Sequence, residues 1–136
     1  MSSTPVILLL CVSPLLAAGS DCADSVVSAE VKQQIIQFHN QRRGRFPVFW
    51  DCALEGEARI TTGPSTHNTG RGVNVIKIDK QKDDKASVNK ALEQWLSDPK
   101  AISNIENKHN KKIGCSHQDR SGKFALVCVY AVPPPS

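Results

Sequence analysis

The sequence predicts an α+β fold in which a mixed or antiparallel sheet is flanked by helices. Three observations lead to this prediction. Apolar residues recur at helical spacing in two well-separated segments, 26–41 and 84–97. Residues 72–78 alternate between apolar and polar, and residues 124–130 form a continuous β-rich run after a glycine turn. Helices and strands mixed in this way within one short chain favour a sheet that buries its faces against helices.

The 136 residues are predicted to divide into three parts. Residues 1–19 are interpreted as a signal peptide, because the apolar run 5–18 is shorter than the roughly 20 residues that span a bilayer and ends in small residues. No Lys or Arg precedes that run, which is atypical, and a buried first helix is the alternative. Residues 20–132 are expected to form one domain and residues 133–136 a flexible proline tail. We therefore expect a secreted, extracellular protein.

Four cysteines remain after the signal peptide is removed: Cys22, Cys52, Cys115 and Cys128. An even number in an exported chain indicates two disulfides. We pair Cys115 with Cys128, because they lie close in sequence on either side of a turn, which leaves Cys22 with Cys52. Each bridge would contribute about 3 kcal/mol in the chain-entropy model. A zinc site is the alternative, but the chain has no Cys-x-x-Cys spacing.

The first helix of the domain is predicted over residues 26–41. Ser25 or Ser28 is a suitable N-cap, and the basic residues 42–45 complement the negative end of the helix dipole. Residues 46–50 are interpreted as a short linker that contains Pro47. Its bulky aromatic side chains are expected to be buried.

A second, short helix is predicted over residues 52–61, with Asp51 as its cap. Residues 62–72 are rich in Gly, Ser, Thr and Asn and are predicted to form a loop. The alternating segment 72–78 follows as a strand. Residues 80–85 are then expected to form a charged, solvated turn.

The third helix is predicted over residues 84–97, where apolar residues form a clear stripe. Residues 101–112 are polar and give no clear assignment. Residues 113–116 and 124–130 are predicted to be two strands joined by a hairpin loop at residues 118–123.

Several motifs follow one another along this chain: His39-Asn40-x-x-Arg43, Trp50-Asp51-Cys52, Arg71-Gly72-Val73-Asn74, Ala91-Leu92-Glu93-Gln94-Trp95, Lys112-Ile113-Gly114-Cys115 and Val127-Cys128-Val129-Tyr130. Together they resemble the CAP superfamily of cysteine-rich secretory, antigen-5 and pathogenesis-related-1 proteins. The Trp-Asp-Cys form is most similar to the activation-associated secreted proteins of parasitic nematodes. The resemblance implies an α/β/α sandwich, reduced in size because this chain is shorter than the usual domain. It also implies a bridge between the last two cysteines.

The resemblance further implies a central cleft in which two His and two Glu hold a divalent metal. His67 matches the first His and Asp98 takes the position of the second Glu. Val73 replaces the first Glu, and His109 lies too close to Cys115 to match the second His. Because two ligands do not make a tight metal site, we expect a vestigial cleft with no metal, no cofactor and no catalytic residue.

The formal net charge of +4 gives a mild preference for anionic partners. Two basic clusters are candidate anion-binding residues: Arg42, Arg43 and Arg45, and Lys108, Lys111 and Lys112. Sulfated glycans or an anionic membrane surface are suitable partners, and plain solvation of a helix end and a loop is the alternative. Aromatic residues make up only 5% of the chain, so a nucleic-acid partner is not expected.

The function that follows is a secreted, non-catalytic CAP-like binding protein, released by a parasite and acting in host interaction. Its partner would be a protein, a glycan or a lipid, and the protein would be a monomer or weak dimer without a transmembrane segment. Two alternatives are a lipid or sterol carrier and a residual metal-dependent or hydrolytic protein with His67 and Asp98 as base and orienter. His39 is expected to be structural, His117 solvated, and Trp50 and Trp95 part of the core.

Overall fold

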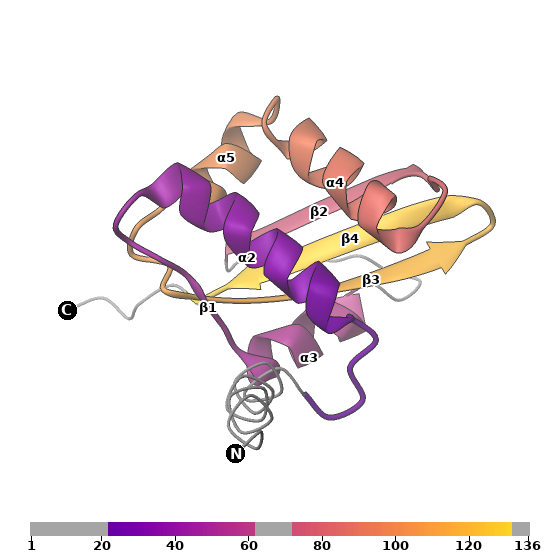
Figure 1. The fold of residues 1–136 in the computed structure, drawn as a ribbon, viewed down its shortest axis with the longest axis horizontal. Coiled ribbons are helices and arrows are strands. Elements are labelled where there is room, and N and C mark those ends of the chain that lie inside the picture. Colours follow the sequence, from indigo (N-terminus) through magenta and orange to yellow (C-terminus); the bar gives the residue numbers. More distant parts are fainter. Residues whose placement is uncertain (1–21, 62–71, 132–136) are drawn as a thin grey trace, which may run out of the picture.

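The computed structural model describes residues 22–61 and 72–131, and it shows a sheet with helices on both faces (Figure 1). Three helices cover one face and α3 covers the other. The helices are α2 (Ala29–Arg43), α3 (Cys52–Thr61), α4 (Asp84–Trp95) and α5 (Pro99–Glu106). The predicted α/β/α sandwich is therefore confirmed. The signal peptide, the proline tail and most of the predicted loop at 62–72 lie outside the described residues.

The sheet has four strands in the order β1-β3-β4-β2. The strands are β1 (Phe49–Trp50), β2 (Gly72–Asp79), β3 (Lys112–Arg120) and β4 (Lys123–Tyr130). β1 pairs parallel with β3, whereas β4 pairs antiparallel with both β3 and β2. The sheet is thus mixed, with the long β3–β4 hairpin at its centre.

The β3–β4 hairpin is tighter than its sequence indicated. A loop was expected at residues 118–123, but β3 continues to Arg120 and only Ser121 and Gly122 form the turn. Both turn residues have positive φ, 53° and 77°, as a two-residue hairpin with a primed turn requires. The polar residues that suggested a loop instead form the outer end of a twisted ribbon.

Two elements were not predicted. β1 occupies residues assigned to a linker, and it is a strand because Phe49 N donates to Lys111 O and Asp51 N to Ile113 O, at 2.9 and 2.8 Å. α5 occupies part of the unassigned polar segment. It begins with Pro99 after the capping residue Asp98, an order that suits a helix start.

Two of the three predicted helices form with shifted ends: α2 was predicted over 26–41, and α4, predicted to reach 97, ends at Trp95. α2 begins at Ala29, because the Ser28 hydroxyl accepts from Val31 N at 3.1 Å, and it continues to Arg43, where Gly44 turns the chain with φ 65°. α3 has the predicted bounds and the predicted Asp51 cap, which accepts from Leu54 N at 3.0 Å.

The main core lies between the sheet and the layer of α2, α4 and α5. Ile35, Trp95 and Tyr130 are among its largest buried side chains, and Trp50 packs half-buried against it. A smaller cluster under α3 includes Leu54. Gly114 allows that helix to approach β3, because a Cβ there would collide with the α3 backbone. The predicted core roles of both tryptophans are confirmed.

Both predicted disulfides are present. Cys115 and Cys128 are directly opposite each other in the β3–β4 register, and Cys22 is bridged to Cys52 at the start of α3. These cysteines are therefore not zinc ligands. Within the described residues, no helix has the length and apolarity needed to cross a membrane.

Candidate functional site

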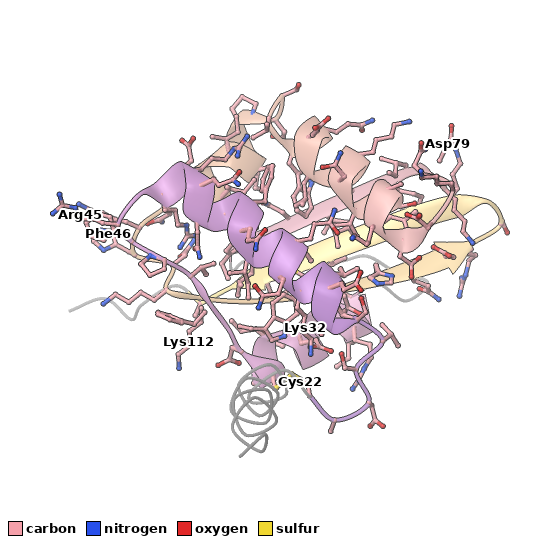
Figure 2. The ribbon with its side chains drawn as sticks, in the orientation of Figure 1. Cys22, Lys32, Arg45, Phe46, Asp79 and Lys112 are labelled. Carbon is pink, nitrogen blue, oxygen red and sulfur yellow. A yellow bond between two sulfur atoms is a disulfide. The ribbon has the colours of Figure 1, made fainter. Side chains whose placement is uncertain are left out.

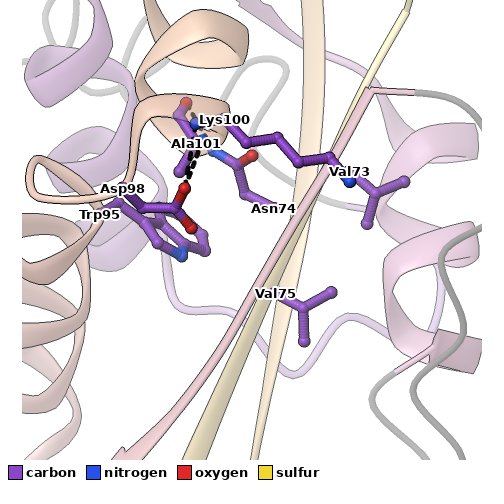
Figure 3. Close-up of a pocket in the computed structure, with 7 residues that line it drawn as sticks. All are labelled: Val73, Asn74, Val75, Trp95, Asp98, Lys100 and Ala101. Atoms are coloured by element: carbon purple, nitrogen blue, oxygen red, sulfur yellow. Dashed lines mark hydrogen bonds between the residues drawn. The ribbon is translucent and has the colours of Figure 1, made fainter.

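A pocket of about 260 Å³ lies between strand β2 and the junction of α4 with α5 (Figure 3). Its lining includes the positions that correspond by resemblance to the two Glu of the CAP cleft, Val73 and Asp98. The other lining residues are Asn74, Val75, Trp95, Lys100 and Ala101. This pocket is the place where a cleft site would be expected.

Asp98 has a structural task in this pocket. Its Oδ1 accepts from Lys100 N at 3.0 Å and from Ala101 N at 3.4 Å, which satisfies the first amides of α5 (Figure 3). A carboxylate at a helix N-terminus is also favoured by the helix dipole. The acid predicted from the resemblance therefore serves as an N-cap.

The described residues of this pocket do not fit a divalent metal. Val73 offers no donor atom, and Lys100, which carries a positive charge, also lines the pocket. Across residues 22–61 and 72–131, no three His, Cys, Asp or Glu side chains come together as a metal site would require. His67, the other predicted cleft residue, lies outside the described residues. We derive no chemistry through a metal here.

Behind the pocket, a buried hydrogen-bond network immobilises His39. The ring accepts from the Tyr130 hydroxyl at 2.7 Å through Nε2, because Nδ1 faces Ile35 O at 2.8 Å and must carry the proton. The pKa of His39 is lowered to about 4, mainly by burial and to a lesser extent by the nearby guanidinium of Arg43. His39 is thus neutral and held on both nitrogens, as a structural histidine should be.

The network continues to the pocket wall through Asn74. Its Nδ2 donates to Ala101 O at 3.1 Å and to the Tyr130 hydroxyl at 3.3 Å, and its Oδ1 accepts from Asn104 at 2.8 Å. Burial raises the pKa of Tyr130 well above its ordinary value. The polar groups behind this pocket are therefore neutral and engaged with one another.

Arg43 was predicted to bind anions, and the structure corrects this. Its side chain points inward and the residue is only 7% exposed. The guanidinium donates to the carbonyl oxygens of Ile105, at 2.6 Å, and Asn104, at 3.3 Å, and also to that of Asn110. A guanidinium with five fixed donors suits such a cluster of carbonyls. Arg43 therefore holds the end of α5 and the segment that follows it against α2.

The other basic candidates remain at the surface. Arg45, Lys108 and Lys111 are exposed, and the Lys112 side chain is 60% exposed with its Nζ 3.8 Å from an Asp51 oxygen. Arg42 is half-buried, with its guanidinium 4.2 Å from the centre of the Phe38 ring. Figure 2 places Arg45 and Lys112 on the same end of the molecule.

Two aromatic residues share this end, contrary to the expectation that the linker side chains are buried. Phe46 is 45% exposed and Phe49 is 62% exposed. Lys108 Nζ lies 5.3 Å from the centre of the Phe46 ring, and Phe49 is the strand partner of Lys112. We call residues 44–49 and 107–112 together the two-loop face.

His117 was expected to be solvated, and this is wrong. Its ring stacks on Phe124 at a centroid distance of 5.2 Å, and Nε2 is buried with no hydrogen-bond partner among the described residues. Burial accordingly lowers the pKa of His117. The residue is half-buried on β3, five residues beyond Lys112 of the two-loop face.

Part of the chain matches a known protein family in sequence. A family model described as the cysteine-rich secretory protein family, CAP, matches residues 37–130. The matched segment includes the hydrogen-bond network, most of the described pocket and the two-loop face. A comparison with curated protein sequences gives no match.

Several solved structures are similar in fold. The hookworm platelet inhibitor superposes with a TM-score of 0.69 at 20% identity, covering 85% of this chain and 76% of the other. The Ancylostoma-secreted protein Ac-ASP-7 gives 0.69 at 24% identity, covering 81% and 73%. Its manganese-bound form gives 0.71 at 23% identity, covering 85% and 75%. At these identities the likeness shows the fold alone.

Proposed function

Because this chain belongs to the cysteine-rich secretory protein family, CAP, we propose that it is a secreted, non-catalytic binding protein that acts in host interaction. Two disulfides support an oxidising, extracellular environment. The names of similar structures, a hookworm platelet inhibitor and an Ancylostoma-secreted protein, support a parasite setting.

The observation that carries the non-catalytic part is the chemistry of the pocket. Asp98 is its acidic group among the described lining residues, and that carboxylate caps α5. Lys100 contributes a positive charge to the same space, which opposes the binding of a cation. These features support a structural, non-catalytic role for the pocket.

The candidate nucleophiles and bases support the same conclusion. A catalytic Cys needs a free thiol, and Cys22, Cys52, Cys115 and Cys128 are all in disulfides. A catalytic His needs a nitrogen directed at substrate, whereas both nitrogens of His39 contact buried protein groups. We propose instead that the protein acts through basic residues at its surface, namely the half-buried Arg42 and the exposed Arg45, Lys108, Lys111 and Lys112.

The alternative of a lipid or sterol carrier gains no support from this pocket. Ligand pockets usually enclose about 300–1,000 Å³ with mostly apolar walls. The volume here is about 260 Å³, and Asp98 and Lys100 place opposite charges on the wall. A carrier site would have to lie elsewhere in the chain.

Metal titration tests the proposal directly. A ligand that binds only the folded state raises the melting temperature, so the secreted protein is heated with and without Zn²⁺ or Mn²⁺. We expect no change in the midpoint, and the same midpoint for Asp98→Asn with and without metal. A rise of several degrees that Asp98→Asn removes would contradict the proposal.

A further inference from the structure

We propose that the two-loop face docks on membrane surfaces that contain anionic phospholipids. This deepens the proposed function and rests on it only in assuming that the protein acts by binding. Three features of the face support this: two exposed phenylalanines, loops that are fixed to each other by hydrogen bonds, and a concentration of positive charge. Together these match a lipid–water interface, where aromatic rings and cations are both favoured.

The first observation is the exposure of two large aromatic rings in a fold that buries others. Phe124 is fully buried in the core, yet Phe46 and Phe49 leave 45% and 62% of their surface in solvent. They lie three residues apart, at the point where the chain passes from α2 into β1. Both rings thus belong to the two-loop face and add to it apolar surface that the fold leaves in solvent.

The second observation is that the loops carrying these rings are fixed to each other. Phe49 N donates to Lys111 O at 2.9 Å, and Val48 N donates to the Asn40 side chain at 2.9 Å. From below, the buried guanidinium of Arg43 donates to the carbonyls of Ile105 and Asn110. The face is therefore preorganised, so little conformational entropy is lost when it binds. Arg43 acts as a positioning residue for it.

The third observation is the charge of the two-loop face. Its two segments contain Arg45, Lys108, Lys111 and Lys112 and no Asp or Glu. The whole chain has 17 Lys and Arg against 13 Asp and Glu, so these segments account for its entire formal net charge of +4. Two acidic residues border the face: Asp51, whose side chain is 26% exposed beside Lys112, and the exposed Glu106, which precedes Asn107 in the chain.

The cations and rings are interleaved rather than separate. Lys108 lies over the Phe46 ring, and Lys112 is beside Phe49 in the β1–β3 register. Figure 2 shows Arg45 and Phe46 at the tip of this end, with Lys112 further along it towards α3. In such an arrangement the rings can enter the headgroup region while the lysine amines extend to phosphate and carboxylate groups.

A soluble sulfated glycan fits this face less well. It would neutralise the lysines but would leave the exposed ring surface in water, so the phenylalanines would contribute little. An anionic bilayer uses both features. The contribution of the rings is therefore the property that separates the two partners.

Vesicle sedimentation tests the proposal with the full secreted protein. Vesicles of phosphatidylcholine alone are compared with vesicles containing about one-third phosphatidylserine, at about 0.1 M salt. We expect partitioning into the anionic vesicles only. Lys108→Gln with Lys111→Gln and Lys112→Gln should reduce it about a hundredfold, from roughly fivefold per charge. Phe46→Ser with Phe49→Ser should reduce it about tenfold or more.

Matched controls lie elsewhere on the surface. Ile60 on α3 is 78% exposed, so Ile60→Ser removes an apolar side chain that is more exposed than either phenylalanine. Lys82 lies before α4 and Lys90 lies on it, and both are exposed. Lys82→Gln with Lys90→Gln therefore removes positive charge outside the two-loop face. Both controls should partition within about twofold of the unsubstituted protein, because surface charge acts within about a Debye length.

Three results would overturn the proposal. The first is no partitioning into anionic vesicles. The second is equal partitioning of the phenylalanine variant and the unsubstituted protein, with the lysine variant reduced, which would assign the face to soluble polyanions such as heparin. The third is an equal loss in the control variants. None of them bears on the metal titration, so failure of membrane docking and failure of the non-catalytic assignment are distinguishable.

Discussion

The pocket beside β2 and the two-loop face use the same kinds of side chain in opposite ways. In the pocket and behind it, Asp98, Asn74 and His39 are engaged by backbone amides, carbonyls and a tyrosine hydroxyl. On the two-loop face, charged and aromatic side chains point outward while the backbone is held from beneath. A polar residue therefore indicates a binding site only when its side chain is not already engaged in hydrogen bonds within the fold.

The largest effect on stability is expected for Arg43→Ala. This substitution tests whether the two-loop face depends on an arginine that points into the protein. It removes donors to three buried carbonyls, and we expect unfolding to become about 3 kcal/mol easier. Urea denaturation measures this. Arg45→Ala changes an exposed neighbour and should stay within about 0.5 kcal/mol. Equal losses of stability in Arg43→Ala and Arg45→Ala would contradict the distinction between a buried, structural arginine and an exposed one.

The buried network should show a pH dependence of nearly the same size. The pKa of His39 is lowered to about 4 in the folded protein, whereas an unfolded His titrates near 6.5. The unfolded state therefore binds the proton first, and the His39 contribution to stability is lost as pH falls from about 6.5 to 4. We expect a loss of about 3 kcal/mol across this range.

Comparison with His39→Gln isolates this contribution. The stability of that variant, measured by urea denaturation at pH 7 and pH 4.5, should depend less steeply on pH than that of the unsubstituted protein. His109→Gln, at an exposed residue of the two-loop face, should keep the full slope. A steep slope in His39→Gln would contradict the assignment.

A moderate effect is expected at the pocket. Asp98→Ala removes an N-cap and should cost about 1 kcal/mol, whereas Asp98→Asn keeps a capping oxygen and should cost less. Thermal or urea unfolding measures both. If Asp98→Ala stabilised the protein, the carboxylate would be better explained as a strained group retained for a ligand.

The smallest effect on stability is expected at the two-loop face. Phe46→Ser with Phe49→Ser removes rings that are largely outside the core, so the midpoint of urea unfolding should shift little, by about 0.5 kcal/mol or less per ring. A large loss of stability would mean that the rings pack as core, and the contrast between the two regions would be lost.

Local signals along the sequence were sufficient for much of the fold. α3 has the predicted bounds because Asp51 caps it, and β2 begins at the predicted Gly72 and ends one residue beyond the predicted end. α5 was missed although its signal was present, since Asp98 followed by Pro99 is a typical helix start. β1 had no signal of its own, because a two-residue strand is defined by its partner β3.

The surface was harder to predict than the fold, for a physical reason. Arg42, Arg43 and Arg45 look alike in sequence, yet only Arg43 is directed inward, to carbonyls at the end of α5 and just after it. Phe46 and Phe49 flank the buried Val48, and which of the three enters the core depends on packing with distant residues. Such choices are made by tertiary contacts and leave no local pattern.

The Cys22–Cys52 bridge has a mechanical consequence. The two sulfurs close a covalent ring that contains all of α2, the loop after it and β1. A pulling force applied to the chain before Cys22 passes through the sulfurs to the start of α3 and bypasses everything inside the ring. The segment 44–49 thus stays unloaded while the end of the chain is under tension, and a protein tethered by that end would keep its aromatic tip intact.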